Sequence, residues 1–225
     1  MSQRGAYHHG DLRAALVAAA LDIVSERGVA GLSVAEAARR TGVSTAAPYR
    51  HFPSRTALLS AAATQSGRQL LEEMRAACDE VRKRLGTADH ADPHFAVEAL
   101  AATARVYVIF AVAHGAAFEL ILADELQDHP DAERREVSRQ IMDLLLWPAV
   151  TLTGEPAAAT QFLWRFTAVV HGFAYLPGSG FIRGHAVGAD FMASQAADVI
   201  RTLARAAIEG SSANHGSEPA TPATE

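Results

Sequence analysis

Apolar residues recur at helical spacing along nearly the whole chain, and no segment alternates convincingly between apolar and polar positions. Residues three or four apart share one face of an α-helix, whereas alternate residues share one face of a strand. Alanine, which loses no side-chain entropy when it enters a helix, supplies 48 of the 225 residues. We therefore expect an all-α protein of about nine helices.

The composition argues against several other classes. No uninterrupted apolar run reaches the roughly 18 residues that a membrane-spanning helix needs, and no signal-peptide core follows Met1. The one cysteine, Cys78, cannot form an internal disulfide, which agrees with a reducing compartment. We expect a soluble, cytoplasmic protein with no membrane partner.

Charge is distributed unevenly along the chain. Residues 1–55 hold seven arginines and four acidic residues, a balance of +3, so the rest carries −8 within the formal net charge of −5. A basic segment on an acidic body is typical of a DNA-binding module joined to a second domain. We expect an N-terminal domain over residues 1–55, a larger helical domain over 56–209, and a disordered tail over 210–225 without apolar anchors.

Two short helices about a glycine-containing turn are predicted within residues 32–51. Ser33 and Glu36 form a capping box at the start of a helix over residues 34–40. Gly42 can adopt the positive φ of a tight turn, and a second helix is expected over residues 45–51. This is the pattern of a helix-turn-helix, whose second helix enters the DNA major groove, although many small helical proteins share the spacing.

The residues around this pattern resemble the N-terminal domain of the TetR family of bacterial transcription regulators. The family pattern Tyr-x-His-Phe is present at residues 49–52, and Arg55 stands where a lysine is more usual. The resemblance covers roughly residues 10–60. It implies an N-terminal three-helix DNA-binding domain, followed by a larger helical domain for ligand binding and dimerisation.

Each predicted DNA-binding residue has a physical role. Arg50 and Thr45 on the second helix can hydrogen-bond to base edges, and the methyl group of Ala46 can contact bases. By resemblance, Tyr49, His51 and Arg55 contact phosphates. Ser33 and Ser44 cap helices, and helix N-termini suit anions. We expect Phe52, Leu16, Ile23 and Val34 to be core residues instead. The predicted DNA-binding residues are Ser33, Ser44, Thr45, Ala46, Tyr49, Arg50, His51 and Arg55.

A second resemblance concerns the C-terminal region. Residues 105–111 and His171-Gly172 resemble the effector domain of a TetR subgroup named for a Trp-His-Gly motif, although Thr167 stands where its tryptophan is expected. The resemblance implies a homodimer formed through the last two long helices, about 156–176 and 188–209. Dimerisation also follows from function, because two copies can read near-palindromic half-sites about 34 Å apart.

Such a regulator usually responds to a small molecule, and aromatic or polar residues of the later helices are candidates to bind it. For each apolar candidate, a well-packed core position is at least as good an interpretation. A histidine in an apolar segment needs a hydrogen-bond partner, which could be a ligand. We expect an apolar or aromatic effector. The candidates are Tyr107, Phe110, His114, Phe118, Met142, Leu145, Trp147, Trp164 and His171.

We expect the protein to be a DNA-binding regulator, which in this family is most often a repressor. Two alternative functions remain open. The loop over residues 89–94 holds metal-competent aspartates and histidines, so a metal-responsive regulator is one of them. A helical interaction protein without DNA binding is the other, and Tyr49, His51 and Arg55 argue against it. No nucleophile elbow, phosphate-binding loop or dinucleotide fingerprint is present in the sequence, so we expect neither an enzyme nor a cofactor.

Overall fold

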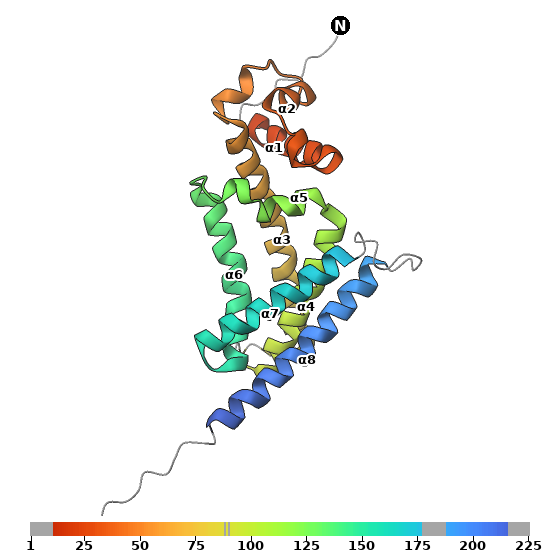
Figure 1. Ribbon diagram of the computed structural model, residues 1–225, viewed down its shortest axis with the longest axis vertical. Coiled ribbons are helices and arrows are strands. Elements are labelled where there is room, and N and C mark those ends of the chain that lie inside the picture. The colour runs from red at the N-terminus through yellow and green to blue at the C-terminus, as the bar shows by residue number, and fades with distance from the viewer. Residues whose placement is uncertain (1–10, 88, 90, 177–187, 216–225) are drawn as a thin grey trace, which may run out of the picture. The chain divides into compact units, whose positions relative to one another are not determined.

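The computed structural model describes residues 11–87, 89, 91–176 and 188–215. Within these ranges every regular element is a helix and no strand is present, which confirms the predicted fold class (Figure 1). The described residues form eight α-helices and four short 3-10 helices, compared with the expected total of about nine helices. They are α1 (Asp11–Arg27), η1 (Val29–Gly31), α2 (Val34–Arg40), η2 (Ala47–Arg50), α3 (Arg55–Leu85), α4 (Pro93–His114), α5 (Ala116–Glu119), η3 (Leu120–Leu122), η4 (Asp124–Leu126), α6 (Ala132–Thr153), α7 (Pro156–Tyr175) and α8 (Ala189–His215).

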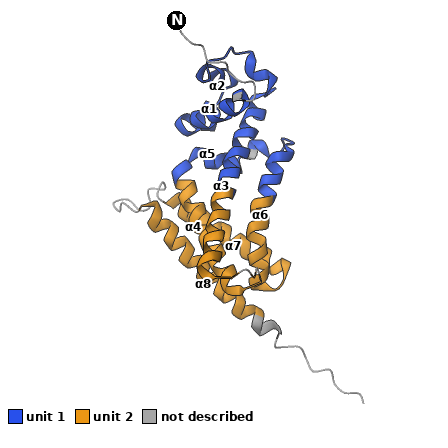
Figure 2. Cartoon of the chain, turned by 180° about the vertical axis from the view of Figure 1, so that it is seen from behind, with its two compact units in different colours: residues 1–71, 113–139 blue, residues 72–112, 140–225 orange. Residues whose placement is uncertain are grey.

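The chain divides into two compact units, coloured separately in Figure 2. Unit 1 comprises residues 1–71 and 113–139, and unit 2 comprises residues 72–112 and 140–225. Helices α3 and α6 each contribute one part to unit 1 and another to unit 2. The predicted DNA-binding segment therefore belongs to a unit that also includes a segment returning from much later in the chain.

Capping side chains fix several helix starts, including the predicted start of α2. Ser33 Oγ accepts a hydrogen bond from the backbone N–H of Glu36 at 3.1 Å, and α2 begins at the next residue. Ser54 Oγ accepts from the N–H of Ala57 at 3.1 Å in the first turn of α3. At the other end of α1, Gly28 has φ of 70°, and its N–H donates to the Val24 carbonyl at 2.8 Å.

The last helix is longer than expected. The sequence predicts its end at residue 209 and a tail from 210, but α8 continues to His215. Gly210 does not adopt the positive φ with which glycine commonly ends a helix, so the helical hydrogen bonds can continue past it. The remainder of the predicted tail, residues 216–225, lies outside the described residues.

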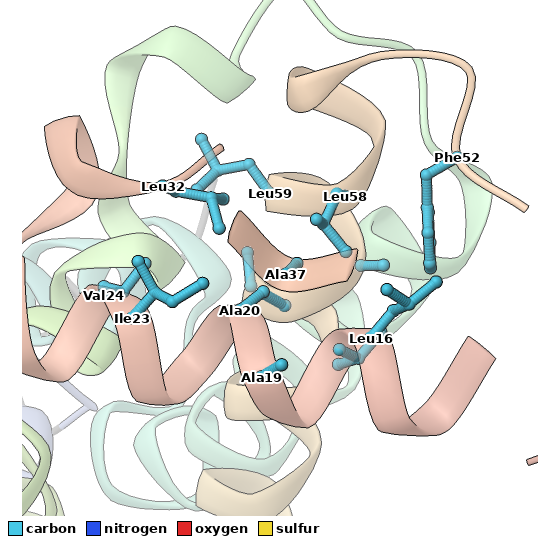
Figure 3. Packing of buried hydrophobic residues seen from close by; sticks show 14 of the residues in the cluster. Leu16, Ala19, Ala20, Ile23, Val24, Leu32, Ala37, Phe52, Leu58 and Leu59 are labelled. Atoms are coloured by element: carbon cyan, nitrogen blue, oxygen red, sulfur yellow. The ribbon is translucent and has the colours of Figure 1, made fainter. Parts of the chain in front are cut away.

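The core of unit 1 lies between α1, α2 and the first turns of α3. Figure 3 shows Leu16 of α1 near Phe52, with Leu58 and Leu59 of α3 in the same cluster. The expected core positions are confirmed, since Leu16 and Ile23 are fully buried and Phe52 is 2% exposed. Two leucines of the returning segment, Leu120 and Leu126, join this cluster, which explains why unit 1 extends beyond residue 71.

Helix α4 is the most apolar long helix in the part of the chain that the structure describes. By length and composition it could cross a membrane, although its apolar sequence is not uninterrupted. However, 67% of its most apolar 18-residue window is buried inside the protein, as in the core helix of a helical unit. Two charged residues within it, Glu98 and Arg105, form ion pairs with α8.

Candidate nucleic-acid interface

Helix α2 is followed by a tight turn that leads to η2. Thr41 caps the end of α2, and its Oγ1 donates to the Ala37 carbonyl at 3.0 Å. Gly42 then adopts φ of 72°, a left-handed conformation that side chains other than glycine rarely tolerate. This turn reverses the chain, so η2 follows α2 as the second element of a helix-turn-helix.

The second element is a 3-10 helix rather than the predicted α-helix over residues 45–51. Proline has no backbone N–H, so Pro48 cannot donate the α-helical hydrogen bond to the carbonyl of Ser44. That carbonyl instead accepts from the N–H of Ala47 at 3.0 Å, one residue earlier, which is the 3-10 pattern. The buried Pro48 thus sets the geometry of this element.

Five of the eight predicted DNA-binding residues lie in the turn and in η2 as exposed side chains: Ser44, Thr45, Ala46, Tyr49 and Arg50. Tyr49 is 55% exposed, which is high for an aromatic residue. No polar side chain of this group forms a hydrogen bond or ion pair with another described residue. His51 follows and is half-buried. The surface, called the η2 surface below, offers two hydroxyl groups, a phenol and a guanidinium to solvent.

Arg50 stands apart from the neighbouring arginines. Among the arginines that the structure describes between residues 11 and 71, all others form an ion pair within unit 1. The positive charge of this segment is therefore largely neutralised internally. The unpaired guanidinium of Arg50 can bind an external acceptor without breaking an existing contact.

Glu36 contacts three of these paired arginines. Its carboxylate accepts hydrogen bonds from Arg39 at 2.7 and 2.8 Å and from Arg40 at 3.3 Å, and it lies 3.6 Å from Arg27. These bonds, led by those of Arg39, lower the pKa of Glu36 to about 2. The network joins the end of α1 to α2 and holds the helix-turn-helix against the rest of unit 1.

Arg55 is placed differently from what its resemblance-based role implies. Its Nη2 donates to the Val29 carbonyl at 2.6 Å, its Nε donates to the Leu32 carbonyl at 2.9 Å, and its Nη1 pairs with Glu125 at 3.2 Å. The side chain thus ties the loop before α2 to the start of α3. A phosphate contact by Arg55 stays a prediction. Nothing in the local pattern pointed to Glu125, because the two residues are 70 positions apart.

The remaining predicted contact, Ser33, acts as the cap of α2 described above, and its backbone lies at a helix N-terminus. Such an end offers free N–H groups to an anion.

The predicted ligand-binding residues do not form one site within either unit. Tyr107 and His171 lie together in unit 2, with Tyr107 Oη 3.0 Å from Nε2 and 3.1 Å from Nδ1 of His171. His171 Nδ1 also lies 2.9 Å from the Thr167 carbonyl oxygen, which can only accept, so the tautomer with its proton on Nδ1 satisfies this contact and leaves Nε2 to accept from the tyrosine. Burial raises the pKa of Tyr107.

The other candidates are divided among core and surface positions. Phe110, Phe118 and Leu145 are buried, whereas Trp164 is 76% exposed. Met142 and Trp164 line an open groove between α6 and α7, and Trp147 lines a different cavity. His114 belongs to unit 1, where its Nε2 lies 3.4 Å from the amide nitrogen of Gln69.

The loop over residues 89–94 uses its described carboxylates for local hydrogen bonds. Asp89 Oδ1 accepts from the N–H of Ala91 at 2.8 Å, and Asp92 Oδ1 accepts from the N–H of His94 at 2.8 Å, capping α4. His90 lies outside the described residues. Among the residues that are described, no group of three or more metal-competent side chains converges.

Comparison with known proteins gives this geometry a context. A family model described as bacterial regulatory proteins, tetR family, matches residues 16–62, which include α2, the turn, η2 and most of α1. No curated protein sequence matches the chain.

Solved structures match over most of the chain. A protein of unknown function from Rhodococcus sp. RHA1 is 30% identical, with a TM-score of 0.68, and the match covers 88% of this chain and 98% of that one. The TetR family transcriptional regulator PfmR from Thermus thermophilus is 17% identical, with a TM-score of 0.55, over 83% and 97% of the two chains. AibR, solved in complex with isovaleryl coenzyme A and operator DNA, is 17% identical, with a TM-score of 0.58, over 84% and 97%.

Proposed function

This chain belongs to the tetR family of bacterial regulatory proteins, and from that premise we propose that it is a ligand-responsive repressor that binds a near-palindromic operator as a homodimer. Its general activity is that of a DNA-binding transcriptional regulator. We propose four further properties: the response to an effector, the repression, the symmetry of the operator and the homodimer.

The η2 surface carries the proposal. Arg50 is exposed and is the one arginine between residues 11 and 71 without an ion pair among the described residues, and it lies in the second element of the helix-turn-helix. A guanidinium in this position can form two hydrogen bonds with a guanine edge, while Thr45 and Ala46 suit hydroxyl and methyl contacts. Tyr49 offers a phenol to a phosphate. These chemistries match the edge and backbone groups of a DNA major groove.

Exposed apolar side chains on α7 and α8 support the homodimer. Trp164 and Tyr175 of α7 are 76% and 46% exposed, and Phe191 and Val199 of α8 are 55% and 36% exposed. The two helices pack against each other within unit 2. A second copy that covered these faces would remove the apolar side chains from water. One η2 surface reads few base pairs, so a dimer also provides the length of operator that specificity requires.

The proposed response to an effector is a shift between two arrangements of the dimer. A ligand that binds more tightly to the arrangement that cannot span both half-sites draws the population away from DNA. AibR was solved with both an acyl-coenzyme A and operator DNA, which is a precedent for the two ligand classes on one fold.

The test uses the full chain and duplex DNA from upstream of its own gene. We expect protection of two half-sites about 34 Å apart, or a multiple of that distance, in a footprinting experiment, and a dimer mass by light scattering. Affinity should fall steeply as salt rises, because neutralised phosphates release counterions. A footprint no stronger than that on unrelated DNA would contradict the proposal.

A further inference from the structure

An open cavity of about 290 Å³ lies in unit 2 between α3, α4 and α6, and none of its α3 or α4 residues was among the ligand-binding candidates. Its apolar side includes Cys78 and Phe95, which are buried members of one small core cluster, together with Ala99 of α4. Trp147 of α6 forms an aromatic wall and is 58% exposed. The volume is at the lower end of the range for small-molecule sites.

Two arginines of α3 and one aspartate of α6 are the charged groups that line this cavity. Arg82 is already engaged, since it pairs with Asp79 at 2.6 Å and its guanidinium lies 5.3 Å from the centre of the Phe95 ring. Arg75 donates to the amide oxygen of Gln140 at 3.1 Å and forms no ion pair with another described residue. A solvent-exposed guanidinium without an ion pair among the described residues therefore lines a cavity that is otherwise largely aromatic and aliphatic.

Asp143 limits the ligands that suit this arrangement. It belongs to the lining, so an anion must bind on the Arg75 side, away from the carboxylate. A planar carboxylate matches the fork of an arginine and can replace the neutral amide of Gln140 as its acceptor. A second anionic group would approach Asp143 and be disfavoured.

Cys78 contributes surface rather than reactivity to the cavity. Burial raises the pKa of its thiol to about 11, so the sulfur stays protonated at neutral pH. The thiol then behaves as a small apolar group beside Phe95.

We propose that this cavity binds a monocarboxylate with one aromatic ring or a short branched apolar chain, with its carboxylate on Arg75 and its apolar body between Trp147 and Phe95. The inference rests on the proposed function, because such a ligand would be the effector. It differs from the sequence expectation, whose candidates contained no charged residue that could select a ligand class.

The first test measures binding directly, without DNA. The chain has two tryptophans, so Trp164→Phe leaves Trp147 as its sole tryptophan. We expect 3-phenylpropionate to change the fluorescence of this variant with a saturable curve and a dissociation constant of about 1 mM or below, as is usual for so small a ligand. The uncharged isostere 3-phenylpropionamide should bind at least about ten times more weakly, because it lacks the charge that Arg75 binds.

Arg75→Gln should reduce the affinity for the carboxylate at least about tenfold and abolish the preference for the acid over the amide. Lys83→Gln is the matched control, because it removes one positive charge from an exposed position of the same helix outside the cavity. Circular dichroism of both variants checks that they fold. Failure of the wild type to bind operator DNA would contradict the proposed function but leave this measurement intact.

Three outcomes would overturn the proposal. They are no saturable change with 3-phenylpropionate, equal affinity for the acid and the amide, and equal losses in Arg75→Gln and Lys83→Gln.

Discussion

Arg40 of α2 binds the carboxylate of Glu26 in α1 through two hydrogen bonds, Nη1 to Oε1 at 2.8 Å and Nη2 to Oε2 at 2.5 Å. Arg40 also contacts Glu36 within its own helix. The pair therefore connects α1 to the first element of the helix-turn-helix, and it places α2 without using any group of the η2 surface.

Removing this pair should destabilise unit 1 in a salt-dependent way. Glu26→Gln keeps the shape of the side chain but loses the charge that Arg40 binds. We expect a lower melting temperature in low salt, and a smaller difference from the wild type in about 1 M NaCl, where the screening length falls to about 3 Å. Glu80→Gln, at an exposed position without an ion pair among the described residues, serves as the control. A difference that does not depend on salt would contradict the electrostatic account.

Acid should weaken the network around Glu36. The pKa of Glu36 is about 2, below its ordinary value of 4.5, because the folded state favours the carboxylate. The stabilisation is therefore fully present above about pH 4.5 and is lost as the pH falls towards about 2. Glu36→Gln should reduce the melting temperature by a constant amount above about pH 5, and the gap should narrow between about pH 4.5 and about pH 3. If the difference in melting temperature between Glu36→Gln and the wild type widened in acid, the predicted direction of the pH dependence would be wrong.

Phe52 should be among the most sensitive core positions of unit 1. It is 2% exposed and shares a cluster with Leu16, and the guanidinium of Arg13 lies 5.4 Å from the centre of its ring. Phe52→Ala leaves a cavity and should lower the free energy of unfolding by about 3 to 5 kcal/mol in urea denaturation. Leu122→Ala, at a position that is 42% exposed, should change it by less than about 0.5 kcal/mol. Similar losses in both variants would contradict this assignment.

Gly42 should resist substitution for a backbone reason. Its φ of 72° is unfavourable for alanine, although a Cβ there would meet no other atom within 4 Å. Gly42→Ala should therefore cost about 1 to 2 kcal/mol in the free energy of unfolding. Gly210→Ala, in open space within α8, should instead stabilise the chain by up to about 1 kcal/mol. If Gly42→Ala were as stable as the wild type, the claim that the positive φ at this position is unfavourable for alanine would be wrong.

The hydrogen bond between Tyr107 and His171 should contribute modestly to unit 2. Tyr107→Phe leaves the half-buried Nε2 of His171 without its donor, which should cost about 1 kcal/mol. Thermal unfolding of the variant and the wild type measures this cost. A stability equal to that of the wild type would mean that water replaces the tyrosine hydroxyl without loss.

Local chemistry explains which parts of the fold were predictable. The capping box of Ser33 and Glu36 fixes the start of α2, and Asp92 before Pro93 fixes the start of α4, because each signal acts within one turn of helix. The 3-10 geometry of η2 was not predicted, although its cause, the missing N–H of Pro48, is also local.

Long-range placement explains what the sequence could not predict. The contact of Arg55 with Glu125 depends on a segment that returns 70 residues later. Helical periodicity likewise does not distinguish a helix face that packs from one that stays exposed. For this reason the buried Phe110 and the exposed Trp164 were both predicted as ligand-binding residues. The role proposed for Arg75 could not be predicted, because a charged residue on a long amphipathic helix has the pattern of an ordinary solvated position.

The most direct test of the central claim compares operator binding by two single-arginine variants. Arg50 and Arg135 are both exposed and unpaired among the described residues of unit 1, but only Arg50 lies on the η2 surface. Fluorescence anisotropy with duplex DNA from upstream of the gene should show a loss of about tenfold or more for Arg50→Ala, as expected for a bidentate base contact. Arg135→Ala should bind like the wild type. Equal affinities of Arg50→Ala and wild type, or equal losses in both variants, would contradict the account.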